Sequence, residues 1–97
     1  MAHGFKILVH RNDDNAHLKL IGEFDDQAAS ELIDTLRICS GSLSKIFIHT
    51  DSLDGITDYD EQNFKNRFYN NTDVPAAKIL STGRYRRIFS TLKGKSF

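Results

Sequence analysis

The stretch that decides the fold is HLKLIGEFDDQAASELIDTLRICSG, residues 17–41. Apolar and polar side chains alternate over residues 17–24, which predicts a β-strand with one buried face. The residues that follow place apolar side chains three and four positions apart, which predicts an amphipathic helix; they are Ala29, Leu32, Ile33, Leu36 and Cys39. A strand that runs directly into a helix begins a right-handed crossover, so the next strand is expected to lie parallel to it.

The two ends of this helix carry residues that commonly cap helices. Asp25 is expected to be the N-cap, because a side-chain oxygen at that position accepts a hydrogen bond from a free backbone N–H of the first turn. Asp26 adds a negative charge that favours the positive end of the helix dipole, and Gly41 suits the position after the last turn. The helix is therefore expected between Asp25 and Gly41.

Another strand precedes residue 17 and forms a hairpin. FKILVH (5–10) and HLKLIGEF (17–24) flank a polar stretch, in which Asn12–Asn15 are expected to form a four-residue loop. One face of the hairpin is then apolar, with Phe5, Ile7, Val9, Leu18 and Leu20; the other, wet face carries Lys6, His10, His17 and Lys19. A slip of one residue would destroy this agreement, so the register is well specified and places His10 opposite His17.

His10 and His17 raise the question of a metal ion. Two imidazoles on neighbouring strands can hold an ion, but a useful site needs a third ligand and groups that orient the ligands. The sequence places no third ligand within reach, so both histidines are interpreted as exposed strand residues. No metal or cofactor is expected.

Beyond the helix, the chain predicts a buried strand followed by an acidic loop. KIFIHT (45–50) contains an unbroken apolar run, which predicts a central strand covered on both faces and parallel to residues 17–24. TDSLDGITDYDEQ (50–62) follows without a Lys or Arg; its carboxylates are Asp51, Asp54, Asp58, Asp60 and Glu61. A loop of this kind suits a metal site, a phosphoacceptor, a helix cap or a surface that a partner reads.

The last part of the chain completes the order of elements. Phe64 and Phe68 stand four residues apart, with Tyr59 one turn earlier, which predicts a helix from about residue 58 to about residue 70. Residues 70–75, which include the single proline, break it, and AAKILST (76–82) predicts a fourth strand. Apolar residues at helical spacing predict a last helix; they are Tyr85, Ile88, Phe89 and Leu92, with Gly94 at its end. The predicted fold class is a single compact α/β domain over residues 1–97, with a mixed four- to five-stranded sheet and about three helices.

Composition limits the function classes. The 97 residues carry no net charge, which argues against a nucleic acid as the main ligand because such affinity comes from many lysines and arginines. No apolar run approaches the roughly 20 residues that span a bilayer, and the first residues do not resemble a signal peptide, so a cytoplasmic location without membrane contact is expected. One cysteine, Cys39, excludes an internal disulfide and is interpreted as a buried apolar residue.

Gly22-Glu23-Phe24-Asp25 resembles the Gly-x-Leu/Phe-Asp motif that opens the first helix of STAS domains. That family is typified by bacterial anti-sigma-factor antagonists, and the order of elements agrees with it over about residues 5–93. The resemblance implies a non-enzymatic signalling module that regulates by binding a protein partner, such as an anti-sigma factor or a kinase-like regulator. In many members a partner kinase phosphorylates a serine or threonine at the start of the second helix.

The corresponding tetrapeptide here is Thr57-Asp58-Tyr59-Asp60. Under the resemblance, Asp58 takes the place of the phosphoacceptor, whereas an alignment shifted by one residue would put Thr57 there. His49 stands where the family usually has an acid near the end of the third strand. Asp58 has two compatible interpretations: an N-cap that forms a capping box with Glu61, or the same cap that also faces a partner with a permanent negative charge.

The acidic loop and the start of the second helix are therefore the predicted contact surface, with Asp54, Thr57, Asp58, Tyr59 and Asp60. The spacing of the acids does not match a calcium loop. No nucleophile with a paired base and no Gly-rich phosphate cradle is recognisable, so no catalytic residue is assigned and an enzyme is not expected.

The basic C-terminal segment supports an alternative function. Six basic residues and no acidic one lie between Lys78 and Phe97. They form either the exposed face of the last helix or an anion site at its start, with Gly83, Arg84 and Arg87 binding a nucleotide or another phosphorylated ligand. The separated charges would also allow two copies to associate as a homodimer.

Overall fold

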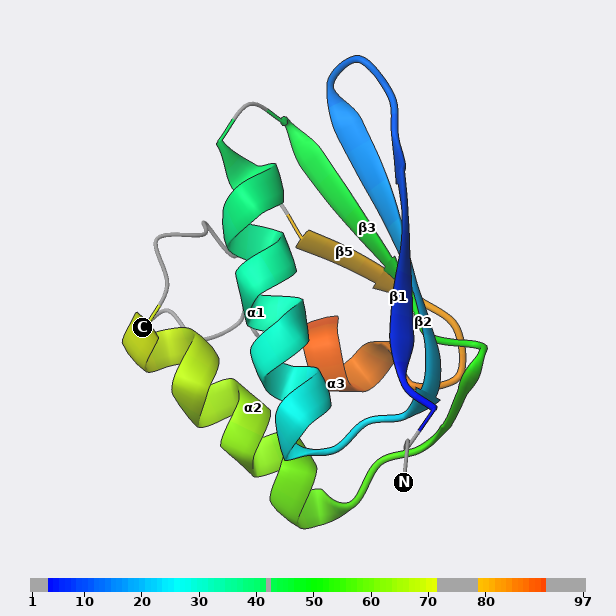
Figure 1. Ribbon diagram of the computed structural model, residues 1–97, viewed down its shortest axis with the longest axis vertical. Helices are drawn as coiled ribbons and strands as arrows, with labels where there is room; N and C mark the ends of the chain where they lie inside the picture. The colour runs from blue at the N-terminus through cyan, green and yellow to red at the C-terminus, as the bar shows by residue number, and fades with distance from the viewer. Residues whose placement is uncertain (1–3, 42, 72–78, 91–97) are drawn as a thin grey trace.

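The computed structural model describes residues 4–41, 43–71 and 79–90, and shows a mixed sheet with its helices on one side (Figure 1). The elements in chain order are β1 (Lys6–Arg11), β2 (Asn15–Glu23), α1 (Asp26–Ser40), β3 (Lys45–His49), β4 (Leu53–Gly55), α2 (Asp58–Asn71), β5 (Ile79–Thr82) and α3 (Arg86–Ser90). The strand order is β1-β2-β3-β5, and β4 pairs with β2. The predicted fold class is confirmed.

The hairpin of β1 and β2 has the predicted register. The two strands are antiparallel over residues 6–11, and His10 lies opposite His17. The backbone N–H of Asn12 donates to the carbonyl of Asn15 at 2.8 Å and closes the loop. The alternation of apolar and polar side chains was sufficient to predict this register, because a shift of one residue would turn every apolar side chain of β2 to the wrong face.

The crossover from β2 through α1 to β3 also follows the prediction. β3 lies parallel to β2, and β5 lies parallel to β3 on its other side. Asp25 caps α1, because its Oδ1 accepts from the backbone N–H of Ala28 at 2.9 Å. Gly41 follows the last turn with a right-handed φ of −62°, so the helix ends without using the conformational freedom of glycine.

The helices cover one face of the sheet, and this decides which apolar residues are buried. Ile46 and Ile48 face the helices and are fully buried, whereas Phe47 points to the open face and is half-buried. The prediction that β3 is covered on both faces is therefore wrong. Val9, expected in the core, is 47% exposed because β1 is an edge strand that pairs only with β2. Cys39 is buried, as predicted.

The acidic loop contains a short strand that its sequence did not predict. β4 pairs in parallel with the end of β2, and the register shifts between Gly22 and Glu23. The side chain of Leu53 is buried, whereas Asp54 is exposed. Three residues are too few for an alternating pattern to stand out from a loop.

The C-terminal elements agree with the prediction where the structure describes them. β5 lies within the predicted strand 76–82, and Ile88 and Phe89 of α3 are buried. Residues 76–78, Leu92 and Gly94 lie outside the described residues. None of the helices in the described ranges is both long enough and apolar enough to cross a membrane.

Three phenylalanines join the end of β2 to two helices. Phe24, Phe64 of α2 and Phe89 of α3 are at most 1% exposed. Their ring centroids lie 5.4–5.8 Å apart with interplanar angles of 73–81°, so each pair packs edge to face. Such pairs contribute about 0.5–1.5 kcal/mol each beyond the burial of their surface.

Replacement of Phe64 by Ala is expected to lower the free energy of unfolding by about 3–5 kcal/mol, because it removes a buried ring and leaves a cavity between two other rings. Urea denaturation followed by circular dichroism measures the change. Tyr59→Ala, on the same helix but 75% exposed, is the matched control and should change stability by at most about 0.5 kcal/mol. Equal losses in the two variants would contradict this account of the core.

Candidate functional site

A hollow of about 320 Å³ lies at the junction of the first helix, the acidic loop and the second helix. Its lining residues are Glu23, Phe24, Asp25, Asp54, Gly55, Ile56, Thr57 and Asp60. Backbone hydrogen bonds hold its walls together, since the N–H of Phe24 donates to the carbonyl of Gly55 at 3.3 Å. The hollow therefore combines three of the five predicted contact residues with the STAS-like motif of residues 22–25.

The sequence analysis did not include Glu23 and Asp25 in this surface. Both flank Phe24, and the burial of its ring fixes the two carboxylates at the rim of the hollow. The pairing of β4 with the end of β2 then brings Asp54 to the same place. Because β4 itself was not predicted, nothing in the sequence indicated that these two acidic segments meet.

Thr57, and not Asp58, is the N-cap of α2. The Thr57 hydroxyl accepts from the backbone N–H of Asp60 at 3.1 Å and donates to the Asp60 carboxylate at 2.9 Å. The side chain of Glu61 binds Lys65 at 2.9 Å instead of reaching back to the cap. The predicted capping box of Asp58 and Glu61 is therefore wrong by one residue. Thr57 and Asp60 have the same spacing of three residues, which is typical of a capping box.

The acids at the starts of α1 and α2 and in the loop before α2 differ in whether they have a partner of opposite charge. Asp26 is held by Arg67, at 3.3 Å, and Glu61 by Lys65. Within the part of the chain that the structure describes, Asp54 and Asp58 have no ion-pair partner, and both are exposed. Their negative charge is thus left to solvent or to a partner.

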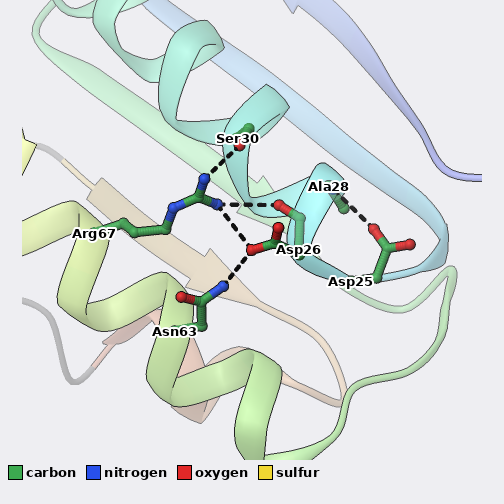
Figure 2. A network of polar contacts seen from close by, with 6 residues as sticks. All are labelled: Asp25, Asp26, Ala28, Ser30, Asn63 and Arg67. Atoms are coloured by element: carbon green, nitrogen blue, oxygen red, sulfur yellow. Dashed lines mark hydrogen bonds and ion pairs between the residues drawn. The ribbon is translucent and has the colours of Figure 1, made fainter.

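Polar contacts between the two long helices hold the first turn of α1 against α2. Figure 2 shows Arg67 of α2 donating to the backbone and side-chain oxygens of Asp26 and to the hydroxyl of Ser30, the last at 2.8 Å. Asn63 donates to the same carboxylate of Asp26. The first turn of α1 is therefore bonded both to its own cap, Asp25, and to α2.

Tyr59, the last of the predicted contact residues, projects from the first turn of α2. Its side chain is 75% exposed, although Phe64 on the same helix is completely buried. A large aromatic side chain gains little from exposure to water, and aromatic residues of this kind are enriched where partners bind. Tyr59 is therefore an exposed aromatic side chain between two acids of the first turn of α2, Asp58 and Asp60.

At the predicted anion site, the required backbone groups already have partners. Gly83 has a φ of +100°, which places the next two N–H groups against the loop after β3. The N–H of Arg84 donates to Oδ1 of Asp51 at 2.9 Å, and that of Tyr85 donates to the Thr50 hydroxyl at 3.0 Å. A ligand anion at these groups would have to displace the carboxylate of the protein itself.

The side chains of Arg84 and Arg87 nevertheless line one shallow hollow of about 350 Å³. Tyr85 and Ile88 supply its apolar wall, and Glu61 places a carboxylate in it. Gly83 does not line this hollow, so the structure separates the predicted glycine from the two predicted arginines. The acid beside the arginines makes the hollow mixed in charge.

The open face of the sheet carries a second polar arrangement, at the end of β3. His17 Nδ1 and His49 Nε2 lie 2.9 Å apart, and His49 Nδ1 lies 2.9 Å from the Thr82 hydroxyl. Burial lowers the pKa of His49 below the usual 6.5, and the charges of His17 and Lys19 act in the same direction, whereas Asp51 raises it. His49 is the last residue of β3.

Comparison with known proteins supports the fold. No protein-family model matches the chain, and no curated protein matches it. Among solved structures, it is similar to an uncharacterised protein of the DUF3478 family with a SpoIIAA-like fold from Shewanella loihica PV-4, with a TM-score of 0.57 and 15% identity over 87% of this chain and 70% of the other. The chain thus has the SpoIIAA-like fold, the fold of STAS domains and anti-sigma-factor antagonists, as the resemblance implied.

Thr57→Ala is expected to destabilise the protein by about 1 kcal/mol, because it removes the side chain that caps α2. Asp58→Ala should cost less, since Asp58 contributes only through the helix dipole and removing its charge relieves repulsion among the neighbouring acids. Urea denaturation of both variants tests the assignment. A larger loss for Asp58→Ala than for Thr57→Ala would return the cap to Asp58.

Stability should also decrease as the pH falls below 6.5. The folded protein disfavours the charged form of His49, so the unfolded chain binds the proton more readily; the stabilisation is complete above pH 6.5 and is lost as the pH falls through the folded pKa. Thermal unfolding in metal-free buffer between about pH 7.5 and about pH 5.5 measures it. His49→Gln should flatten the profile, and an unchanged profile would be incompatible with this role of His49.

Proposed function

We propose that this protein is a non-enzymatic regulatory module that binds a basic surface of a protein partner through the acidic hollow and the first turn of α2. The observation that carries the proposal is that the exposed carboxylates of Glu23, Asp54 and Asp58, at and beside one hollow, have no ion-pair partner among the described residues. An exposed tyrosine, Tyr59, lies next to Asp58 in the chain. The SpoIIAA-like fold supports it, because the resemblance to STAS domains implies a module that acts by binding a protein partner.

The charge of the hollow determines the chemistry of the partner. Glu23 and Asp54 lie on its rim, and Asp58 extends the same charge onto α2. Lysine or arginine side chains of a partner would neutralise these acids, accelerate the encounter and exclude partners of the wrong charge. Because the acids are exposed, the attraction should weaken as salt is added.

Tyr59 provides the apolar part of the contact. Interfaces obtain most of their binding energy from a few aromatic or arginine side chains that become buried, with charged residues at the rim. Tyr59 is exposed and stands between Asp58 and Asp60 in the chain. Its position suits an anchor that becomes buried on binding, with the acids arranged around it.

The charge of this surface is proposed to be permanent. Asp58 holds one negative charge where related domains add a phosphate of about −1.5 to −2 charges, so the site stays in one state without a kinase. A phosphate on Thr57 would displace the hydrogen bond to Asp60 and would lie beside its carboxylate. Both effects disfavour modification of Thr57 and favour constitutive binding.

An enzymatic role has less support. Neither histidine, cysteine nor lysine lines the acidic hollow, so it lacks the groups that usually supply a nucleophile or tune a base to neutral pH. We therefore propose binding in place of turnover, with an anti-sigma factor or a kinase-like regulator as the class of partner that the STAS resemblance implies.

The double variant Asp54→Lys/Asp58→Lys is expected to weaken partner binding by at least about tenfold, equivalent to about 1.4 kcal/mol, because it reverses two exposed charges at the contact. The partner is first identified with a photo-crosslinking amino acid at position 59 in a lysate of the source organism. Its affinity is then measured by calorimetry at low and high salt. Binding should weaken with salt for the original protein and less steeply for the double variant.

The control for this experiment is Asp13→Lys, which reverses an exposed acid in the hairpin loop at the other end of β2. It should leave binding unchanged, and thermal unfolding should show that all variants remain folded. If the double variant and the control bind equally well, the surface is assigned incorrectly. Saturable stabilisation by a nucleotide that Arg84→Ala removes would instead support the anion-binding alternative.

A further inference from the structure

We propose that His17 and His49 form a binding site for one borderline transition-metal ion, with Zn²⁺ as the simplest probe, on the open face of the sheet. This site is separate from the acidic hollow and goes beyond the proposed function. His17 lies opposite His10 in the hairpin, as the sequence predicts, but its ring contacts that of His49, 32 residues later in the chain.

The two imidazoles are held in a fixed relative orientation. His17 stacks on Phe47, with ring centroids 4.7 Å apart and an interplanar angle of 14°. The rings of His17 and His49 are within 3° of parallel and their centroids lie 5.1 Å apart. With Nδ1 of His17 only 2.9 Å from Nε2 of His49, the rings lie edge to edge, and the two nitrogens face each other.

Two ring nitrogens at this distance form one N–H···N hydrogen bond, and a metal ion can replace the proton between them. The Thr82 hydroxyl, 2.9 Å from Nδ1 of His49, can accept the proton of that nitrogen and leave Nε2 with a free lone pair. A group that accepts from the outer nitrogen is the usual support of a metal-binding histidine. When neutral His17 carries its proton on Nε2, its Nδ1 also presents a lone pair, so each ring offers one nitrogen to the same ion.

Binding of zinc would change both the separation and the orientation of the two nitrogens. Zn–N bonds of about 2.0–2.1 Å at a tetrahedral angle place two nitrogens roughly 3.3–3.4 Å apart. The nitrogens would have to separate by roughly 0.4–0.5 Å. Because their lone pairs now point at each other, each ring would also have to turn by roughly 35° to direct its lone pair at the shared ion, and rotation about the side-chain torsions allows both movements. Imidazole nitrogen prefers Zn²⁺, Cu²⁺ and Ni²⁺ to Mg²⁺ and Ca²⁺, so the ligand class is a borderline transition metal.

The remaining coordination positions and nearby charges define what kind of site this is. Among the described residues, no group of three His, Cys, Asp or Glu side chains is arranged to hold a metal ion, so water completes the coordination. Asp51 contributes a favourable negative charge near His49, and Lys19 an unfavourable positive one. Exposed water ligands make the bound ion exchangeable and accessible to a further ligand.

The reference protein for the test is His3→Ala, because His3 lies outside the described residues and could bind metal on its own account. After treatment with EDTA and dialysis at neutral pH, Zn²⁺ is titrated by calorimetry. One ion per chain is expected, together with a concentration-dependent rise in the melting temperature. His17→Asn and His49→Asn, each added to the reference, should abolish saturable binding, with circular dichroism to verify folding.

Two further variants separate a built site from general histidine binding. Thr82→Val keeps the shape of the side chain but removes the acceptor for His49 Nδ1, and it should weaken binding by about 10-fold or more. His10→Asn should leave the affinity unchanged. Binding that survives in both His17→Asn and His49→Asn, or that is lost in His10→Asn but not in His49→Asn, would overturn the proposal.

Discussion

The edge-to-face packing of Phe24, Phe64 and Phe89 joins the end of β2 to α2 and α3. These three elements are far apart in the sequence, because α1, β3 and β4 lie between β2 and the first of the two helices. A ring at each contact fixes both distance and angle, because edge-to-face pairs lose energy when either changes. The acidic hollow lies beside Phe24, so the positions of its carboxylates depend on this cluster.

Placing all the helices on one face leaves the protein with two surfaces of different chemistry. Beyond the end of β2, Asp54 and Asp58 are exposed and have no ion-pair partner among the described residues, whereas Asp26 and Glu61 are tied to Arg67 and Lys65. The open face of the sheet instead exposes histidines and half-buried aromatic side chains. The proposed partner surface and the proposed ion site therefore lie on separate parts of the described chain.

Local sequence signals were reliable where a single side chain or a single pattern decides the outcome. The register of the hairpin and the cap of α1 by Asp25 were both predicted, since each depends on residues adjacent in the chain. The N-cap of α2 was predicted at Asp58 but is Thr57. Both residue types can cap a helix, and which of them does so depends on the residue at which the helix begins. β4 was missed because three residues carry too little pattern.

The sequence by itself determined the α/β class, the mixed order of strands and the presence of an acidic segment at the start of the second helix. Only the tertiary structure decided that Glu23 and Asp25 join Asp54 around one hollow. It also decided that the carboxylate of Asp51 accepts a hydrogen bond from the backbone N–H of Arg84, which an anion was expected to bind. It also decided that His17 faces His49. The physical reason is that periodicity reports which face of an element is buried, whereas contacts between strand ends depend on parallel pairing and helix packing, which bring together residues about 30 or more positions apart.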